Sequence, residues 1–377
     1  MRVKTILSMD AVPDMIIADD VLSFSGQLII PKGTVLTNRS ITRLKFYSIP
    51  NIKVLVEESE DIDEQEAASQ GQAAGRQEQK PVYRTFSDSI RQSPEYKEFN
   101  KNVVESAKVL QDSLSSFITR ENDDINTNVL LNQTKDTIAA SRNPLHTFHM
   151  LQSMRDYDDA TFIHSLNVSI ICNAFGTWLG LSQEENDILT LAGLLHDVGK
   201  LKIPDTIIKK PGSLTEAEFA MVKLHPRRGY AILKNLPVDP RIRNAALMHH
   251  ERCDGSGYPS GLKADQIDDM AKIIAIADIY DAMTSARVYR GPLCPFDVIS
   301  VFENEGCQRF DPHYQMVFLN NIVDSYVNNT VRLTDGREGE IVMINQNKLS
   351  KPIVRVGDEF VDLSKKENHH IGVEAIL

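Results

Sequence analysis

The chain has 377 residues, and at about 150 residues per domain this length predicts two or three domains. Its apolar fraction of 42% and charged fraction of 25% are typical of soluble globular proteins. The net charge of −11 argues against broad nucleic-acid binding, so an anionic ligand would require a local cluster of basic residues.

Segments that would direct the chain to a membrane or an oxidising compartment are not evident. Charged residues interrupt every candidate membrane span, and the first ten residues lack the sustained apolar stretch of a signal peptide. The four cysteines lie far apart, with no CxxC pair. These features predict no membrane insertion and reduced thiols in a cytoplasmic protein.

Residues 1–56 are predicted to form a small β-rich domain. Short apolar runs at 15–17, 27–30 and 53–56 are separated by turn signals, and a short helix from Asn38 would place Ile41 and Leu44 on one face. Residues 57–66 contain seven acidic residues and no base, and a stretch rich in Gln, Ala and Gly follows. This composition cannot bury enough apolar surface to fold, so residues 57–82 are predicted to be a linker.

The next two regions are predicted to be helical, and the last one β-rich. Residues 83–150 form a connecting region with helices at 95–118 and about 126–142, the second ending before Pro144. These helices could form a dimerisation element or belong to the core. Residues 151–328 are predicted to be one all-helical domain, and residues 329–377 a β-rich extension with a hairpin at Asp335-Gly336. The predicted fold is therefore mainly α.

The first chemical signal is a buried helix that ends in a histidine and an aspartate. A capping box from Ser182 to Glu185 begins an apolar stripe that ends at His196-Asp197. An unpaired buried carboxylate is costly. Either a metal ion or a salt bridge to Lys200 would stabilise it, and this pair of residues alone leaves both explanations open.

Further histidines and aspartates occur at helical positions nearby. Taken singly, a histidine on an apolar helix face is more often a satisfied core residue. Together, however, five of the ten histidines and two or three carboxylates come to the inner faces of five helices. They are His164, His196, His225, His249, His250, Asp197, Asp278 and Asp281. Pro226 is expected to disrupt the helix that carries His225.

This ordered set resembles the metal ligands of the HD superfamily of phosphohydrolases. The stretch from His250 through Gly257-Tyr258-Pro259 looks like the signature of the HD-GYP subfamily. Further matches are HDVGK from His196, ADIYDAMT from Ala277 and FDP from Phe310. The resemblance covers about 150–325, somewhat under half of the chain, and implies an all-helical HD-type metal phosphohydrolase domain.

The resemblance also implies a binuclear metal centre. Asp197 would bridge two divalent first-row transition metal ions, with iron or manganese favoured by the mixed donor set. His164, His196 and Asp278 would hold one ion, and His225, His249 and His250 the other. In this scheme Asp197, His196 and Lys200 are the catalytic residues.

The substrate implied is a cyclic dinucleotide such as cyclic di-GMP. Lys200, Arg287 and Arg290 resemble the phosphate- and base-binding residues of the family, because guanidinium groups match phosphate oxygens. The loop residues Gly257, Tyr258 and Pro259, together with Asp281, complete the predicted substrate contacts. A homodimer and the absence of nucleic-acid partners are further expectations.

The chain departs from the family pattern at two places. Ala160 lies one helical turn before His164, where some members carry a third-metal glutamate, so we predict two ions rather than three. Cys253 replaces a usual aromatic residue, and Ala286 and Val288 stand where Asp and Pro are common.

Three functions follow from these observations. The first is hydrolysis of cyclic di-GMP to pGpG, with or without further cleavage to GMP. The second is a receptor that binds the ligand with little turnover. The third is a phosphodiesterase for hybrid cyclic GMP-AMP.

Overall fold

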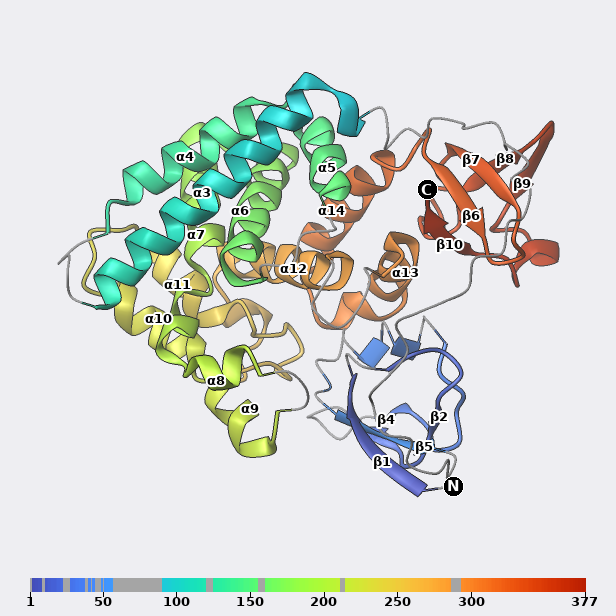
Figure 1. Ribbon diagram of the computed structural model, residues 1–377, viewed down its shortest axis with the longest axis horizontal. Helices are drawn as coiled ribbons and strands as arrows, with labels where there is room; N and C mark the ends of the chain where they lie inside the picture. Colours follow the sequence, from blue (N-terminus) through green and yellow to red (C-terminus); the bar gives the residue numbers. More distant parts are fainter. Residues whose placement is uncertain are drawn as a thin grey trace, which may run out of the picture.

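The structure is a computed structural model that describes residues 2–8, 11–22, 28–37, 40–41, 43–44, 49, 51–56, 90–119, 125–154, 160–210, 214–285 and 293–377. Figure 1 shows N-terminal strands, a large group of helices and a C-terminal sheet. The predicted linker and residues 286–290 lie outside the described residues.

The N-terminal strands form two small antiparallel sheets, as the β-rich prediction required. Strands β1 (Arg2–Leu7), β5 (Asn51–Val56) and β2 (Ile16–Ile17) lie in that order, while β3 (Val21–Leu22) pairs with β4 (Leu28–Ile30). Strand β1 was not predicted. Ile41 and Leu44 are buried at helical positions, as expected.

The central part of the chain is helical, as predicted. Its elements are α3 (Pro94–Ile118), α4 (Thr127–Ala139), α5 (Pro144–Ser153), α6 (Ala160–Trp178), α7 (Gln183–Leu195), η2 (Val198–Lys202), α8 (Asp205–Ile208), α9 (Glu216–Val222), α10 (His225–Leu233), α11 (Pro240–Met248), η3 (Ala264–Gln266), α12 (Asp269–Thr284), α13 (Pro295–Glu305), η4 (Gly306–Gln308) and α14 (Pro312–Asp324). Helices α3 and α4 pack on α6, so they belong to the core.

Helix α6 lies inside this group and contacts α3, α5, α7 and α12 (Figure 1). Leu166, Val168 and Ile170 are each at most 1% exposed. A helix that is apolar on several sides is stable only when it is surrounded by other elements. The polar His164 on such a helix is therefore held in a rigid, largely apolar setting.

The C-terminal region is a five-stranded antiparallel sheet rather than a single hairpin. Its order is β10 (Val373–Ile376), β6 (Thr330–Leu333), β7 (Glu338–Met343), β8 (Ile353–Val356) and β9 (Glu359–Asp362), and η5 (Lys366–Asn368) precedes β10. The predicted β6–β7 hairpin is confirmed, with Gly336 at φ +86°. The Glu303 carboxylate accepts hydrogen bonds from the main-chain N–H groups of Leu349 and Ser350, which joins the sheet to α13.

Both β-rich parts touch the helical region. Arg43 forms an ion pair with Glu305 at 2.5 Å, and the Asn51 side-chain amide donates to the Leu214 carbonyl at 3.2 Å. The division of the chain into five segments stays a prediction. Among the described helices, none combines the length and apolar content needed to cross a membrane.

Candidate metal centre

The end of α7 places His196 and Asp197 in the interior. The Ser182–Glu185 capping box forms as predicted, and His196 is the C-cap residue of α7. The His196 Nδ1–H donates to the Gly193 carbonyl at 2.7 Å. This bond fixes the ring and leaves Nε2 as the nitrogen available to a ligand.

His225 reaches the same place from the start of α10. The expectation that Pro226 disrupts the helix carrying His225 is wrong. Helix α10 begins at His225, and the proline lies in its first turn. Proline is favoured there because its missing N–H would have no helical partner. The His225 Nδ1–H donates to the Val222 carbonyl at 2.7 Å, so its Nε2 also faces inward.

Gly199 allows η2 to lie directly against the start of α10. A Cβ atom at Gly199 would come within 2.0 Å of the His225 carbonyl oxygen and 2.5 Å of the Gly229 nitrogen. Both neighbours are main-chain atoms, so the close approach of Asp197 to His225 depends on this glycine.

We expect Gly199→Ala to lower the free energy of unfolding by about 3 kcal/mol or more, because the added methyl overlaps fixed backbone. In a domain of this size that corresponds to a fall in Tm of roughly 6–12 °C. Gly229→Ala is the matched control. Its Cβ would meet ordinary contacts at 3.4 Å and beyond, and alanine is the better helix former. Thermal unfolding curves showing equal Tm values for both variants would contradict this assignment.

The remaining side chains come from α6, α11 and α12. His249 follows α11, and its Nδ1 lies 3.1 Å from the Ala246 carbonyl oxygen. His250 comes next along the chain, and Asp278 lies on the buried face of α12. His164 extends from α6, with its Nε2 3.1 Å from Asp278 Oδ1.

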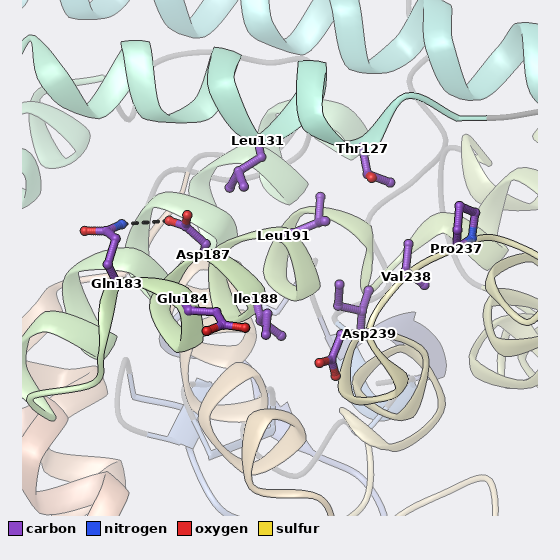
Figure 2. Close-up of a pocket in the computed structure, with 11 residues that line it drawn as sticks. Thr127, Leu131, Gln183, Glu184, Asp187, Ile188, Leu191, Pro237, Val238 and Asp239 are labelled. Atoms are coloured by element: carbon purple, nitrogen blue, oxygen red, sulfur yellow. Dashed lines mark hydrogen bonds between the residues drawn. The ribbon is translucent and has the colours of Figure 1, made fainter.

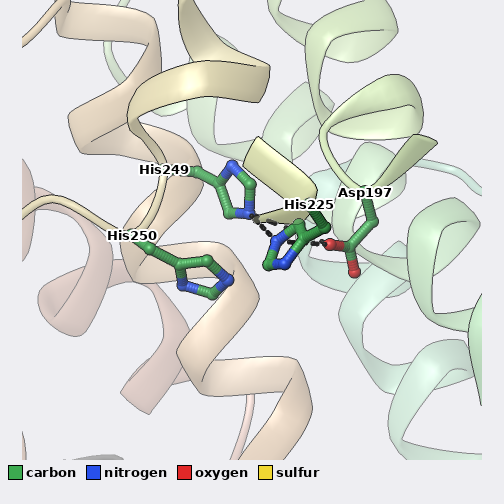
Figure 3. Close-up of side chains that lie close together, drawn as sticks. All are labelled: Asp197, His225, His249 and His250. Carbon is green, nitrogen blue, oxygen red and sulfur yellow. Dashed lines mark hydrogen bonds and ion pairs between the residues drawn. The ribbon is translucent and has the colours of Figure 1, made fainter. Parts of the chain in front are cut away.

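These side chains form two groups that could each hold a metal ion. Asp197, His225, His249 and His250 make one group (Figure 3), and His164, His196 and Asp278 make the other. Within each group the potential ligand atoms all lie within 4.8 Å of one another. The structure therefore brings together all seven residues predicted as metal ligands.

Asp197 belongs to the group with His225 and also faces the group with His196. Its Oδ1 is 3.3 Å from His225 Nε2, and its Oδ2 is 3.4 Å from His196 Nε2. The His164 Nε2 is 3.8 Å from the same Oδ2. A carboxylate with one oxygen directed to each group is suited to bridging two ions.

Burial and charge set the protonation of the site. Burial lowers the pKa of His225 to about 4 and that of His249 to about 3, so both rings are neutral and keep a free lone pair. Burial alone would raise the pKa of Asp197, but Lys200 and His196 outweigh it and hold that pKa well below its ordinary value. Lys200 also binds the Asp197 carboxylate directly, so the salt bridge considered from the sequence is present.

Two buried polar atoms in the centre lack a hydrogen-bond partner within the protein and are suited to binding a metal ion. His196 and Asp197 are 0% and 2% exposed, and His196 Nε2 and Asp197 Oδ1 have no hydrogen-bond partner. Buried polar atoms without partners are costly. Neutral imidazole and carboxylate donors are ligands of first-row divalent ions, so the residues present fit such ions.

Asp281 lies behind His164. Its Oδ2 accepts from His164 Nδ1 at 2.7 Å, while its Oδ1 accepts from Asn167 at 3.2 Å and Ser285 at 2.9 Å. Burial by itself would lower the pKa of His164, but Asp278 and Asp281 raise it to about 9. The contacts that the structure gives Asp281 are within the protein, and its predicted role in binding substrate stays a prediction.

The loop with Gly257, Tyr258 and Pro259 lies beside the group that contains His250. The Tyr258 ring stacks on His250, with centroids 4.7 Å apart and planes 27° apart. Burial raises the pKa of the Tyr258 hydroxyl. The aromatic face of this tyrosine is thus part of the wall next to the predicted ligands.

Several predicted residues lie outside what the structure describes. Arg287, Arg290, Ala286 and Val288 fall in the undescribed range, and the side chain of Ala160 is not placed. In contrast, sequence reasoning missed the contacts of Glu251, Asn167 and Gly199. The separate surface pocket of Figure 2, between α4, α7 and the α10–α11 connection, shares no residue with the histidine cluster.

Comparison with known proteins agrees with this geometry. A family model described as an HD domain matches residues 134–314. The chain is 36% identical over 224 residues to the cyclic di-GMP phosphodiesterase PA4108 of Pseudomonas aeruginosa, covering 59% of this chain and 54% of that protein. It is 44% identical over 141 residues to the cyclic di-GMP phosphodiesterase response regulator RpfG of Xanthomonas campestris, covering 36% of each chain. It is 39% identical over 167 residues to the 3'3'-cGAMP-specific phosphodiesterase 1 of Vibrio cholerae, covering 44% of this chain and 39% of that protein.

The helical region that carries the ordered histidines and aspartates therefore matches an HD domain over residues 134–314. The match begins at residue 134, so it includes part of the region predicted to connect the domains. Over this region the chain is similar to curated cyclic dinucleotide phosphodiesterases. The chain spans about half or less of the length of these three relatives.

Proposed function

We propose that this protein is a metal-dependent phosphodiesterase that hydrolyses cyclic di-GMP to linear pGpG in the cytoplasm. The observation that carries the proposal is the pair of ligand groups that Asp197 connects, one oxygen facing His225 and the other facing His196. The printed activities of PA4108 and RpfG support the substrate class. A second cleavage would yield GMP.

His164, His196 and Asp278 would hold one divalent ion, and His225, His249 and His250 the other, with Asp197 shared between them. We propose iron or manganese. Bound at such a site, two ions make a water nucleophile available near neutral pH and neutralise charge that develops on phosphate.

In the proposed reaction water adds across the P–O3′ bond of the diester. Phosphorus gains the water oxygen, and the 3′ oxygen leaves carrying a proton. Lys200 is 26% exposed and bound to Asp197, so its ammonium group is near enough to the cluster to bind a phosphate oxygen. We propose that Arg287 and Arg290 supply further phosphate contacts, by their resemblance to the family pattern.

The remaining residues would orient these groups. Asp281 would hold the His164 ring through Nδ1, and the stacked Tyr258 would form an aromatic surface for a base. A hybrid cyclic GMP-AMP is the second candidate substrate, because the relative from Vibrio cholerae is named as specific for 3'3'-cGAMP.

Turnover of purified protein tests the proposal. The protein is prepared without oxygen, supplied with cyclic di-GMP or with the hybrid dinucleotide, and its products are separated by chromatography. We expect multiple turnovers of cyclic di-GMP to pGpG. Tight binding without product would instead establish a receptor, and preferential cleavage of the hybrid dinucleotide would reassign the substrate.

A further inference from the structure

The loop after His250 is held by a buried glutamate whose role the residue pattern did not reveal. Glu251 is 3% exposed. Its Oε1 accepts from the main-chain N–H of Ser260 at 2.7 Å, and its Oε2 accepts from that of Leu262 at 2.9 Å. One carboxylate thus closes the loop at two points, 9 and 11 residues further along the chain.

The middle of the same loop is pressed against the backbone beside Glu251. A Cβ atom at Gly257 would lie 2.4 Å from the Arg252 nitrogen and 2.5 Å from Glu251 Cα, so only glycine fits. The next residue, Tyr258, donates its main-chain N–H to the His250 carbonyl at 3.2 Å. The loop therefore folds back along residues 250–252 and presents the Tyr258 ring to His250.

We infer that Glu251 is a positioning residue that sets Tyr258 against His250 before any ligand arrives. Hydrogen bonds to a buried carboxylate are stronger than neutral ones, and two from one group fix both its own rotamer and the backbone that donates. Without them the loop would keep the Tyr258 N–H bond, the bond from Arg227 to the Pro259 carbonyl and the Asp254–Lys263 bridge, but the N–H groups of Ser260 and Leu262 would lose their carboxylate partner. The ordering of the loop would then have to accompany substrate binding, which weakens that binding.

This inference rests on the proposed function only in naming the ligand. The positioning itself makes a prediction about the loop that needs no substrate. A purely structural role for Glu251 would lower the stability of the fold without changing how substrate binds.

The chain offers a matched control in Glu303. Its carboxylate also accepts from two main-chain N–H groups, those of Leu349 and Ser350, but it holds the C-terminal sheet. The variants are Glu251→Gln, Glu251→Asp and Glu303→Gln, all made in the full chain. Glutamine keeps the size of the side chain while replacing one acceptor oxygen by a donor, whereas aspartate keeps the charge on a shorter side chain.

The first measurement is amide hydrogen exchange followed by mass spectrometry. We expect the peptide containing Ser260 and Leu262 to exchange at least about tenfold faster in Glu251→Gln than in the wild type, because two protecting bonds are weakened. Glu303→Gln should leave that peptide unchanged. Unchanged exchange in Glu251→Gln would overturn the inference, whether or not the wild type hydrolyses a cyclic dinucleotide.

The second measurement is steady-state kinetics with cyclic di-GMP, together with the metal content of each variant. For Glu251→Gln we expect KM to rise about tenfold or more, kcat to stay within about threefold and metal content to match the wild type, since uniform binding is lost. Glu251→Asp should recover part of the KM, and it replaces Glu251→Gln in both measurements if the latter fails to fold. Equal loss of Tm in Glu251→Gln and Glu303→Gln, with KM unchanged in both, would establish a structural role and overturn the inference. A wild type without turnover contradicts the proposed function, and hydrogen exchange still decides the role of Glu251.

Discussion

Replacing Asp197 by asparagine should lower turnover of cyclic di-GMP by about 1,000-fold or more. Removing a single preorganised hydrogen-bond donor from an active site lowers kcat by about 100- to 1,000-fold, so the expected loss is at the upper end of that range or above it. Asp197 directs one oxygen to His225 and the other to His196, and asparagine, which keeps a single uncharged oxygen, cannot serve both ligand groups. The amide is nearly the same size, so packing is preserved while the negative charge is lost. We expect metal content, measured by mass spectrometry of the purified protein, to fall below two ions per chain.

Asp187→Asn is the matched control for this substitution. Asp187 lies on α7 like the residues leading to the site, and its carboxylate also binds a lysine, Lys135, at 2.5 Å. Removing the charge of Asp187 should leave turnover and metal content at the wild-type level. If Asp197→Asn kept two ions per chain, the bridging role would be wrong, and if both variants lost activity equally, the effect would be one of folding.

The sequence signals for the buried His196–Asp197 pair were local. The capping box at Ser182 and the apolar stripe after it place His196 and Asp197 at a buried helix end. Periodicity likewise predicted a helix at 95–118, which is observed as α3 (Pro94–Ile118). The assignment of the seven residues to two groups came from the family resemblance, and the structure reproduces both groups.

What the sequence could not predict are contacts between residues far apart in the chain. His164 and Asp281 are separated by 117 positions, and Glu251 looks like an ordinary polar residue until the loop folds back onto it. Gly199 is similar, since its close contact with His225 exists only after η2 and α10 have packed. Spacing carries no information about such partners, because it describes one element at a time.

The β-rich ends show a related limit. Strands β1, β9 and β10 were not predicted individually from the sequence. Their pairing with β5, β8 and β6 supplies the stability that the local sequence lacks. The position of Pro226 was misinterpreted for a different reason. A proline can follow the end of one helix or lie in the first turn of the next, and here it lies in the first turn of α10.

The wild type should bind two divalent ions per chain, and each ligand group should be separable by substitution. His164→Ala removes a donor from the group with His196 and Asp278, while His225→Ala removes one from the group with His249 and His250. We expect each variant to retain about one ion. Saturating ligand at about 1,000 times its dissociation constant stabilises a fold by about 4 kcal/mol, so complete chelation should lower Tm by at least roughly 8–16 °C.

The number of bound ions tests the prediction that Ala160 excludes a third metal ion, and this test does not depend on activity. Alanine has no donor atom, so the position one turn before His164 cannot supply a ligand to a third ion. His313→Ala, on α14 and outside both ligand groups, is the control that should keep two ions and the wild-type Tm. Three ions bound stoichiometrically to the wild type would refute the binuclear assignment. Loss of both ions in His164→Ala and in His225→Ala alike would instead show that the two groups bind cooperatively through the shared Asp197 carboxylate.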